Sequence, residues 1–407
     1  MTPSVTVLTS TPFWRGGNGS TVRISALLRH LLGEGVRLRV VFAGSLRAAD
    51  HERLHRAGLG RITLRETGSP PPTPPMDAPL HAFDDPAARR VLADDLARST
   101  PTALIIEYLR HANALDGLGH DVRARVLTIL DTHDVQHERA ARFASVARPH
   151  QLAITRAEEA ETLAAFDMLL AIQGRDAQSL ARMAPGAEVL TVPHAIEPAQ
   201  AAPAQPDRTP PQSSPPTVGF VGSASHANAD GLAWFLRDCW ADVRERVPGV
   251  TLEIAGDVDQ LLACEGLTHK TLAAMGVRAL GVVPDLVALR EGWTAELCPL
   301  RIGGGLKIKT VEALGAGVPV ISTPIGAEGF ADTPADALRI ASDGPAFAST
   351  LETLCDARAW SDASRSARHA ARRSFSPDAA YGPLVARLRS HAVSHDRRSC
   401  LTGELTP

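Results

Sequence analysis

Short apolar runs alternate with amphipathic stretches along nearly the whole chain. The runs predict buried strands at 5–9, 38–43, 103–106, 126–130, 168–172 and 189–192, and again at 218–221, 251–255, 277–280, 295–297 and 318–322. Apolar residues at helical spacing predict helices at 20–32, 86–97 and 154–166, and at about 228–247, 258–275 and 306–316. This alternation is typical of parallel sheets that are covered by helices on both faces.

One segment interrupts the alternation. Residues 198–216 contain seven prolines and no apolar periodicity, which predicts an extended interdomain linker. We therefore expect an N-terminal α/β domain at 1–197, a C-terminal α/β domain at 217–390 and a polar, flexible tail at 391–407. A second Pro-rich stretch, at 69–75, is interpreted as a surface loop, with a role as a ligand for aromatic-lined grooves as the alternative.

The composition narrows the class of protein. The chain has 407 residues, of which 44% are apolar and 21% charged, as in ordinary soluble proteins of two domains. A net charge of −3 provides no global basic field for nucleic acid, although a local patch stays open. The apolar runs are too short for a spanning helix, and the first residues lack the pattern of a signal peptide. Five scattered cysteines form no metal-type pair, which favours the reducing cytoplasm.

Lysine is rare in this chain, and its placement is informative. Only three of the 42 basic residues are lysines, and Lys307 and Lys309 lie just after three consecutive glycines. Glycines let a ligand approach the backbone, and the free N–H groups at a helix start suit phosphate. With Arg301 nearby, two cations could neutralise a diphosphate, and Glu312 on the same helix could accept hydrogen bonds from ribose hydroxyls. A Gly-rich loop with solvated charges is the alternative.

The segment at 298–330 resembles the donor-binding motif of the retaining glycosyltransferases of the GT-B fold, family 4 or group 1 type. The matching residues are Pro299, Leu300, Arg301, Gly303, Gly305, Lys307, Lys309, Glu312, Ala313, Gly317, Pro319 and Val320. Further similarity lies at 16–17, 130–135, 219–222, 226–231 and 234–235. The resemblance implies two doubly wound, Rossmann-like domains that face a cleft, with a nucleotide diphosphate sugar on the C-terminal domain and a hydroxyl acceptor on the N-terminal one.

The resemblance also implies roles for individual residues. Catalytic roles are expected for His133, Lys307 and Arg301, and Glu107 is expected on the acceptor side. A structural role is the alternative for His133. Donor-binding roles are expected for Gly16, Gly17, Gly303, Gly304, Gly305, Lys309, Glu312, His226 and Glu328.

The resemblance implies a reaction without a metal or another cofactor. An Asp-Val-Asp sequence at 257–259 imitates a metal motif, but we interpret it as a loop and helix cap because it follows a predicted strand. Asn228 is expected to cap the helix that follows it.

The chain departs from the family pattern in two places. Many members carry two glutamates separated by seven residues; the second matches Glu312, and the first falls on Gly304. The usual Arg and Lys after the first strand of the C-terminal domain are replaced by Ser, Ala, Ser and His at 223–226. Which cation contacts the diphosphate therefore does not follow from the sequence.

The expected activity is the transfer of a hexosyl-type sugar with retention of configuration, in bacterial glycan biosynthesis. One alternative is a nucleotide-sugar 2-epimerase, for which Glu107, Asp131 and Glu328 would be the acid–base candidates. Another is a non-catalytic subunit that binds a nucleotide sugar. No nucleic-acid partner is expected, and peripheral membrane association stays open. The sugar, the base, the acceptor and the oligomeric state do not follow from the sequence.

Overall fold

The computed structural model describes residues 2–201, 209–211 and 215–403. The chain divides into two compact units. The first unit comprises the residues up to Gly16, Ser20–His194 and the residues from Ala380 on, and the second comprises Gly17–Gly19 and Ala195–Ala379. Each unit is an α/β body built on a parallel sheet, as the alternation of the sequence predicts.

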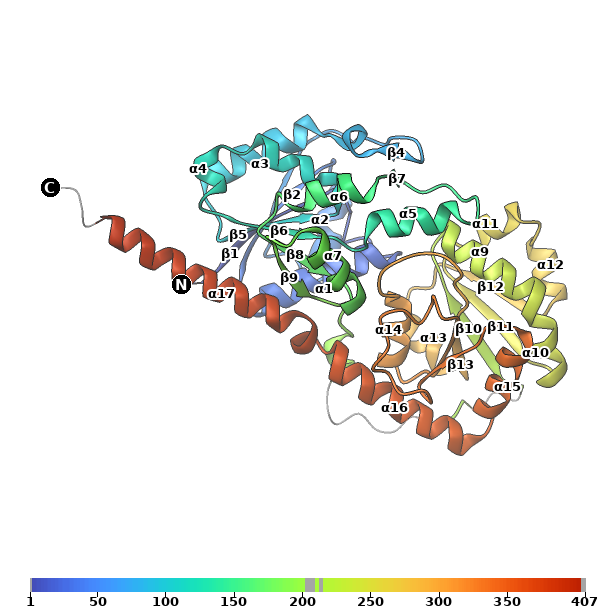
Figure 1. Cartoon of the computed structure of the whole chain (residues 1–407). Helices are drawn as coiled ribbons and strands as arrows, with labels where there is room; N and C mark the ends of the chain where they lie inside the picture. The colour runs from blue at the N-terminus through green and yellow to red at the C-terminus, as the bar shows by residue number, and fades with distance from the viewer. Residues whose placement is uncertain (1, 202–208, 212–214, 404–407) are drawn as a thin grey trace. The chain divides into compact units, whose positions relative to one another are not determined.

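The first unit contains a seven-stranded sheet with the order β3-β2-β1-β5-β6-β8-β9 (Figure 1). The strands are β1 (Ser4–Thr9), β2 (Arg37–Phe42), β3 (Thr63–Glu66), β5 (Ala103–Glu107), β6 (Leu127–Asp131), β8 (Met168–Ala171) and β9 (Glu188–Thr191). Every residue of β5 and β6 is buried, which explains why apolar residues dominate both strands. Parallel pairing places Glu107 and Asp131, the last residues of these two strands, opposite one another.

Helices flank this sheet, and α1 (Gly19–Gly33) shows how an apolar stripe packs against it. In α1 the buried side chains include Ile24, Leu27, Leu28 and Leu31, at the spacing of helical turns. The other helices up to His194 are α2 (Ala48–Arg56), α3 (Pro86–Arg98), α4 (His120–Arg123), α5 (Gln136–Ala144), α6 (Arg156–Leu163) and α7 (Gly174–Met183), with 3-10 turns at η1 (Leu80–Phe83) and η2 (Leu109–Gly117). A small separate sheet pairs β4 (Ala78–Pro79) with β7 (Leu152–Ala153).

The second unit contains a six-stranded sheet with the order β12-β11-β10-β13-β14-β15. The strands are β10 (Thr217–Val221), β11 (Thr251–Ala255), β12 (Val277–Gly281), β13 (Ala295–Cys298), β14 (Val320–Ser322) and β15 (Leu338–Ile340). Its helical segments are α8 (Pro198–Ala201), α9 (His226–Trp234), the π-helix η3 (Phe235–Cys239), α10 (Trp240–Arg246), α11 (Asp259–Cys264), α12 (His269–Ala274), α13 (Leu286–Glu291), α14 (Ile308–Gly315), α15 (Gly344–Leu354) and α16 (Ala357–Phe375).

The helix predicted at 258–275 is two helices rather than one. Gly266 has a φ of 79°, in the left-handed region that ends a helix. Thr268 then starts α12 by accepting a hydrogen bond from the backbone N–H of Thr271 at 3.4 Å. A local turn and a cap therefore divide a stretch whose apolar spacing looks continuous.

The domain boundaries differ from the prediction at the C-terminal end. The last helix, α17 (Pro377–Gly403), groups with the first unit from Ala380 on, so the predicted domain at 217–390 extends too far. The cause is an apolar stripe whose members are buried: Ala380, Tyr381, Leu384, Val385, Leu388 and Ala392. The ring of Tyr381 lies 5.3 Å from that of His30, and Arg389 donates to Glu34 at 2.9 Å.

The structure describes most of the predicted tail and only parts of the predicted linker. Helix α17 continues through Gly403, so the segment from 391 to that residue is helical rather than a tail; residues 404–407 lie outside the described part. Most of the predicted linker, at 202–208 and 212–214, also lies outside the described residues. Its start forms α8, which groups with the second unit.

Candidate functional site

The Gly-rich loop before α14 needs glycine for its backbone. Gly303 has a φ of 120° and Gly305 a φ of 61°, values that side chains strongly disfavour. Lys307 occupies the cap position of α14, which begins two residues later than the sequence predicts. The loop therefore reaches the helix through conformations that fix where the two lysines stand.

Both lysines lie beside this loop, and both have internal partners. The ammonium of Lys307 donates to the carbonyl oxygens of Gly304 and Gly305 at 3.1 and 2.8 Å. The ammonium of Lys309 donates to Oδ1 of Asn228 at 2.8 Å and lies 4.1 Å from the centroid of the Phe220 ring. Burial lowers the pKa of Lys309. A bound anion would stabilise the charged form of this ammonium, which burial disfavours.

Asn228 is not the helix cap that the sequence predicts. Ser225 is extended and accepts a hydrogen bond from the backbone N–H of Asn228 at 3.3 Å, so it caps α9. Asn228 instead lies in the first turn, where its amide donates to the carbonyl of Ser223 at 3.0 Å and accepts from Lys309. His226 is the first residue of α9 and is half-buried.

Arg301 forms an ion pair of its own. Its Nε and Nη2 each donate to the carboxylate of Asp230 at 3.1 Å, and its guanidinium carbon lies 5.7 Å from the Trp234 ring. Its side chain is 41% exposed, so the outer part remains open to a ligand. Glu328 is half-buried in the turn after β14.

Glu312 contacts a buried charge cluster that was not predicted from the sequence. Arg290, from α13, donates to Glu296 of β13 at 2.8 Å through Nε and at 3.4 Å through Nη2. Its Nη1 and Nη2 both lie 3.3 Å from Oε2 of Glu312. We call Arg290, Glu296 and Glu312 the second-unit cluster.

The cluster sets the electrostatics around Glu312. Burial raises the pKa of Glu312, and the neighbouring guanidinium of Arg290 opposes that rise. Burial alone would lower the pKa of Arg290, but the carboxylates of Glu296 and Glu312 outweigh it and raise the pKa. Arg290 therefore stays cationic and favours the ionised form of Glu312.

The first unit holds a comparable cluster at the carboxyl ends of β5 and β6. Nη2 of Arg23, from α1, lies 2.9 Å from both carboxylate oxygens of Asp131. Oε2 of Glu107 lies 2.7 Å from Nε2 of His133. Glu107, expected to contact the acceptor, is 0% exposed, so in this structure its carboxylate contacts His133 instead of facing solvent. We call Arg23, Asp131, Glu107 and His133 the first-unit cluster.

His133 is held by its neighbours in an unusual backbone conformation. Its φ is 58°, and that of Tyr108 is 72°. The two rings stack with centroids 3.8 Å apart and planes 8° from parallel, and the guanidinium of Arg110 lies 4.1 Å from the centre of the Tyr108 ring. The Tyr108 hydroxyl shares a hydrogen bond with Ser20. Such strain is retained where the surroundings over-determine the conformation, as they do at many functional sites.

Burial raises the pKa of Glu107, and the nearby Asp131 carboxylate adds to that effect, whereas the hydrogen bond from His133 opposes it. Glu107, Asp131 and His133 are close enough together to hold a metal ion. However, Arg23 already engages both oxygens of Asp131, and a guanidinium at that distance would repel a divalent cation. The residues present therefore fit an ion pair better than a metal site.

The glycines after β1 are explained by conformation. Gly16 has a φ of 65° and Gly17 a φ of 91°, and among the described residues no atom beyond the adjacent ones lies within 4 Å of where a Cβ would stand on either. Their requirement for glycine therefore lies in the backbone angles rather than in a close approach.

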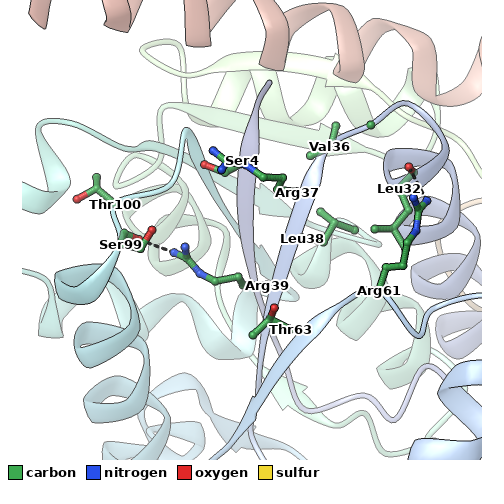
Figure 2. Close-up of a pocket in the computed structure, with 11 residues that line it drawn as sticks. Ser4, Leu32, Val36, Arg37, Leu38, Arg39, Arg61, Thr63, Ser99 and Thr100 are labelled. Atoms are coloured by element: carbon green, nitrogen blue, oxygen red, sulfur yellow. Dashed lines mark hydrogen bonds between the residues drawn. The ribbon is translucent and has the colours of Figure 1, made fainter. Parts of the chain in front are cut away.

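A cavity of about 460 Å³ in the first unit does not belong to this chemistry. Figure 2 shows Ser4, Arg37 and Thr63 around it, which are the first residues of β1, β2 and β3. Glu107 and Asp131 lie at the opposite, carboxyl ends of their strands, where open parallel sheets bind ligands. Two more arginines line the cavity, and Figure 2 shows both bonded internally, Arg39 to Ser99 and Arg61 to Leu32.

The second unit contains a segment that matches a known protein family. Residues 215–357, which contain the Gly-rich loop, both lysines and the second-unit cluster, match the family described as Glycosyl transferases group 1. This part of the chain is similar to a group 1 glycosyltransferase domain. Lys307, Lys309 and Glu312 lie within it.

A curated relative and several solved structures are also similar. The chain is 29% identical over 137 residues to the "Uncharacterized 44.6 kDa protein in cps region" of Klebsiella pneumoniae, a match that covers 32% of this chain and 35% of the relative. Sucrose-phosphate synthase from Thermosynechococcus elongatus matches with a TM-score of 0.69 and 14% identity over 96% of this chain and 100% of that one. HepE from Anabaena, in complex with UDP and glucose, matches with a TM-score of 0.68 and 11% identity over 96% and 100%. Together with the two Rossmann-like sheets, these matches show that the chain has the GT-B fold.

Proposed function

We propose that the protein transfers a sugar of the hexosyl type from a nucleoside diphosphate sugar to a hydroxyl acceptor, with retention of anomeric configuration. The observation that carries the proposal is the gathering of Lys307, Lys309 and Glu312 around a Gly-rich helix start, inside the glycosyltransferase domain. Cations and helix-terminal amides suit a diphosphate, and a carboxylate suits a ribose diol. The UDP and glucose in the structure of HepE are consistent with a donor of this class.

The chemistry proposed at this site needs stabilisation of a departing diphosphate. The bond between the anomeric carbon and the diphosphate oxygen breaks, and the acceptor oxygen bonds to that carbon from the same face. The acceptor proton passes to an oxygen of the departing diphosphate. Lys307 and Lys309 would each exchange an internal oxygen partner for a diphosphate oxygen, and Arg301 would add charge from its exposed side, so that negative charge is met as it develops.

In this proposal, the first unit supplies the residues on the acceptor side and no metal takes part. His133 would act beside the transferred sugar, held by Glu107 and by the Tyr108 ring. Free thiols at all four cysteines whose side chains the structure describes support a reducing compartment such as the cytoplasm. Within the described residues, no helix combines the length and apolar character needed to cross a membrane. The match to a protein of a cps region supports a role in bacterial glycan biosynthesis.

The proposal is tested by a thermal-shift screen of the full chain against nucleoside diphosphates and their sugars. A ligand at 100 times its Kd adds about 2.7 kcal/mol to the free energy of unfolding, which such a screen detects. The donor that is found is then incubated without acceptor, and the sugar released by slow hydrolysis is examined by NMR. Retention requires that the first sugar released carry the donor's own anomeric configuration. The absence of any nucleotide effect on stability would contradict the proposal.

One observation favours a second candidate, a nucleotide-sugar 2-epimerase. The first-unit cluster brings together Glu107, Asp131 and His133, groups that can exchange protons. In the acceptor-free incubation, an epimerase converts the donor into an isomeric nucleotide sugar, whereas a transferase only hydrolyses it slowly. A chain that binds the donor but gives no turnover, with or without an acceptor, would instead be a non-catalytic subunit. The presence of Gly304 in place of a glutamate is the reason for this alternative.

A further inference from the structure

Glu312 is held asymmetrically. Both nitrogen–oxygen contacts from Arg290 go to Oε2, each at 3.3 Å. Within the described residues, Oε1 has no hydrogen-bond partner, and it is not among the atoms shut off from solvent. The side chain as a whole is 24% exposed. One oxygen of the carboxylate is therefore fixed inside the domain while the other is left open.

The fixed side depends on a guanidinium that is buried and held by several partners. Arg290 is 2% exposed, and its Nε and Nη2 donate to the carboxylate of Glu296 at 2.8 and 3.4 Å. Its Nη2 also donates to the backbone carbonyl of Lys309 at 3.4 Å. Paired, planar contacts of this kind hold a guanidinium in one orientation, which a lysine ammonium would not reproduce.

The oriented guanidinium of Arg290 has two consequences for Glu312. It fixes the rotation of a carboxylate that would otherwise turn freely about its last torsion. It also favours the ionised, acceptor-only form against the effect of burial. The two lone pairs of Oε1 are then presented in one direction, ready to accept hydrogen bonds from two neighbouring hydroxyl groups.

We propose that Arg290, anchored by Glu296, is a positioning residue for nucleoside recognition, because it aims Oε1 of Glu312 at the two ribose hydroxyls of the donor. The inference rests on the proposed function, since it deepens the same binding site. It concerns selectivity between ribose and deoxyribose, and the diphosphate contacts of Lys307 and Lys309 are separate from it.

The test measures selectivity by calorimetry on the full chain. Dissociation constants are determined for nucleoside diphosphates and for their 2′-deoxy and 3′-deoxy analogues, starting with UDP, GDP and ADP. We expect the wild type to prefer the ribose form about tenfold to a hundredfold, as for hydrogen bonds to a charged group. In the double variant Arg290→Met, Glu296→Gln, which removes both buried charges together, the preference should fall to about threefold or less. Its affinity for the deoxy analogues should change by less than about threefold.

A conservative variant and a matched control accompany the double variant. Arg290→Lys keeps the charge but lacks the planar fork, so it should lose most of the preference while remaining folded. Arg278→Met breaks another Arg–Glu pair of the same unit, in which Arg278 donates to Glu253 at 2.8 Å, and should keep the wild-type preference. Circular dichroism and cooperative thermal unfolding establish that each variant is folded.

The outcomes separate the inference from the function on which it rests. A wild type that binds no nucleoside diphosphate overturns both. A wild type that binds ribose and deoxyribose forms equally overturns the inference alone, because Glu312 then makes no ribose contact. Wild-type preference retained in folded Arg290→Lys or in the double variant also overturns the inference alone.

Discussion

Both charge clusters pair a buried arginine with carboxylates, but they differ in how they meet solvent. In the first-unit cluster, Arg23, Asp131 and Glu107 are all 0% exposed, and His133 forms the outer member. In the second-unit cluster, exposure rises from Glu296 at 1% and Arg290 at 2% to Glu312 at 24%. A buried ion pair contributes little net stability, because desolvation offsets the attraction. The difference therefore lies in which group each cluster presents outward: an imidazole in one and a carboxylate in the other.

Removing His133, the outward group of the first-unit cluster, should have the strongest effect on activity. We expect His133→Ala to lower kcat by about 10²–10⁴, the range for loss of a positioned polar group in catalysis. Affinity for the bare nucleoside diphosphate should hardly change, because that ligand is assigned to the second unit. Kinetics normalised to folded protein, with nucleotide titration on the same samples, check both statements. Near-normal turnover with lowered thermal stability would assign His133 a structural role.

Removing the inner cation tests whether the first-unit cluster depends on its ion pair. Arg23→Met leaves the buried carboxylate of Asp131 without its ion-pair partner, so we expect the free energy of unfolding to fall by about 3–5 kcal/mol. Urea denaturation measures this, and the double variant Arg23→Met, Asp131→Asn should recover most of the loss. Arg365→Met, which breaks an exposed pair with Asp362, serves as the control and should cost less than about 1 kcal/mol. Equal losses for both arginines would contradict this account of the first-unit cluster.

The residues of the two clusters also differ in how far each could be predicted from the sequence. Glu107 and Asp131 could be found because each directly follows an apolar run, and ends of parallel strands meet at one sheet edge. Arg23 could not, because its partner lies 108 residues away and its helix looks like an ordinary amphipathic one. Glu296 did leave a signal: it is a lone carboxylate inside a buried strand, and such a group requires a cation. That requirement could have led to a search for Arg290.

The limits of the fold prediction have a similar origin. The strands of both sheets were found largely from their apolar runs, and only short ones such as β3 and β15 were missed. The destination of α17 was not predictable, because an apolar stripe shows that a helix packs but not against which unit it packs. Local spacing determines the elements, whereas contacts between distant segments determine their grouping.

The lysines provide a smaller, graded test of the second unit. Replacing Lys307 or Lys309 by Ala should weaken nucleoside diphosphate binding by about 1.5–3 kcal/mol, as expected for a charged hydrogen bond. Arginine at either position should restore only part of the loss, because its geometry differs. Lys270→Ala is the matched control, since this third lysine is exposed on α12. Unchanged nucleotide affinity in both test variants would remove the pair from the donor site.

The smallest expected effect is the pH dependence that Glu312 imposes on stability. Burial raises its pKa above 4.5, so its contribution to stability is complete below about pH 4.5 and is lost as the pH rises through the raised value. Glu312→Gln should therefore gain stability relative to the wild type as the pH increases through that window, measured by urea denaturation. Glu158→Gln should show the opposite sign, because hydrogen bonds from Thr155 lower the pKa of Glu158. Parallel profiles for the wild type and Glu312→Gln would contradict this prediction.

The grouping of α17 with the first unit has a consequence for the order in which the protein is made. The ribosome releases a chain from its N-terminus, and domains usually fold as they emerge. Here the strands of the first sheet emerge early, yet the helix from Ala380 that covers part of that unit emerges only after all of Ala195–Ala379. The side chains that pack against Tyr381 and Leu384 therefore stay uncovered while all of Ala195–Ala379 is synthesised and folds. The unit that is translated first is the unit that is completed last.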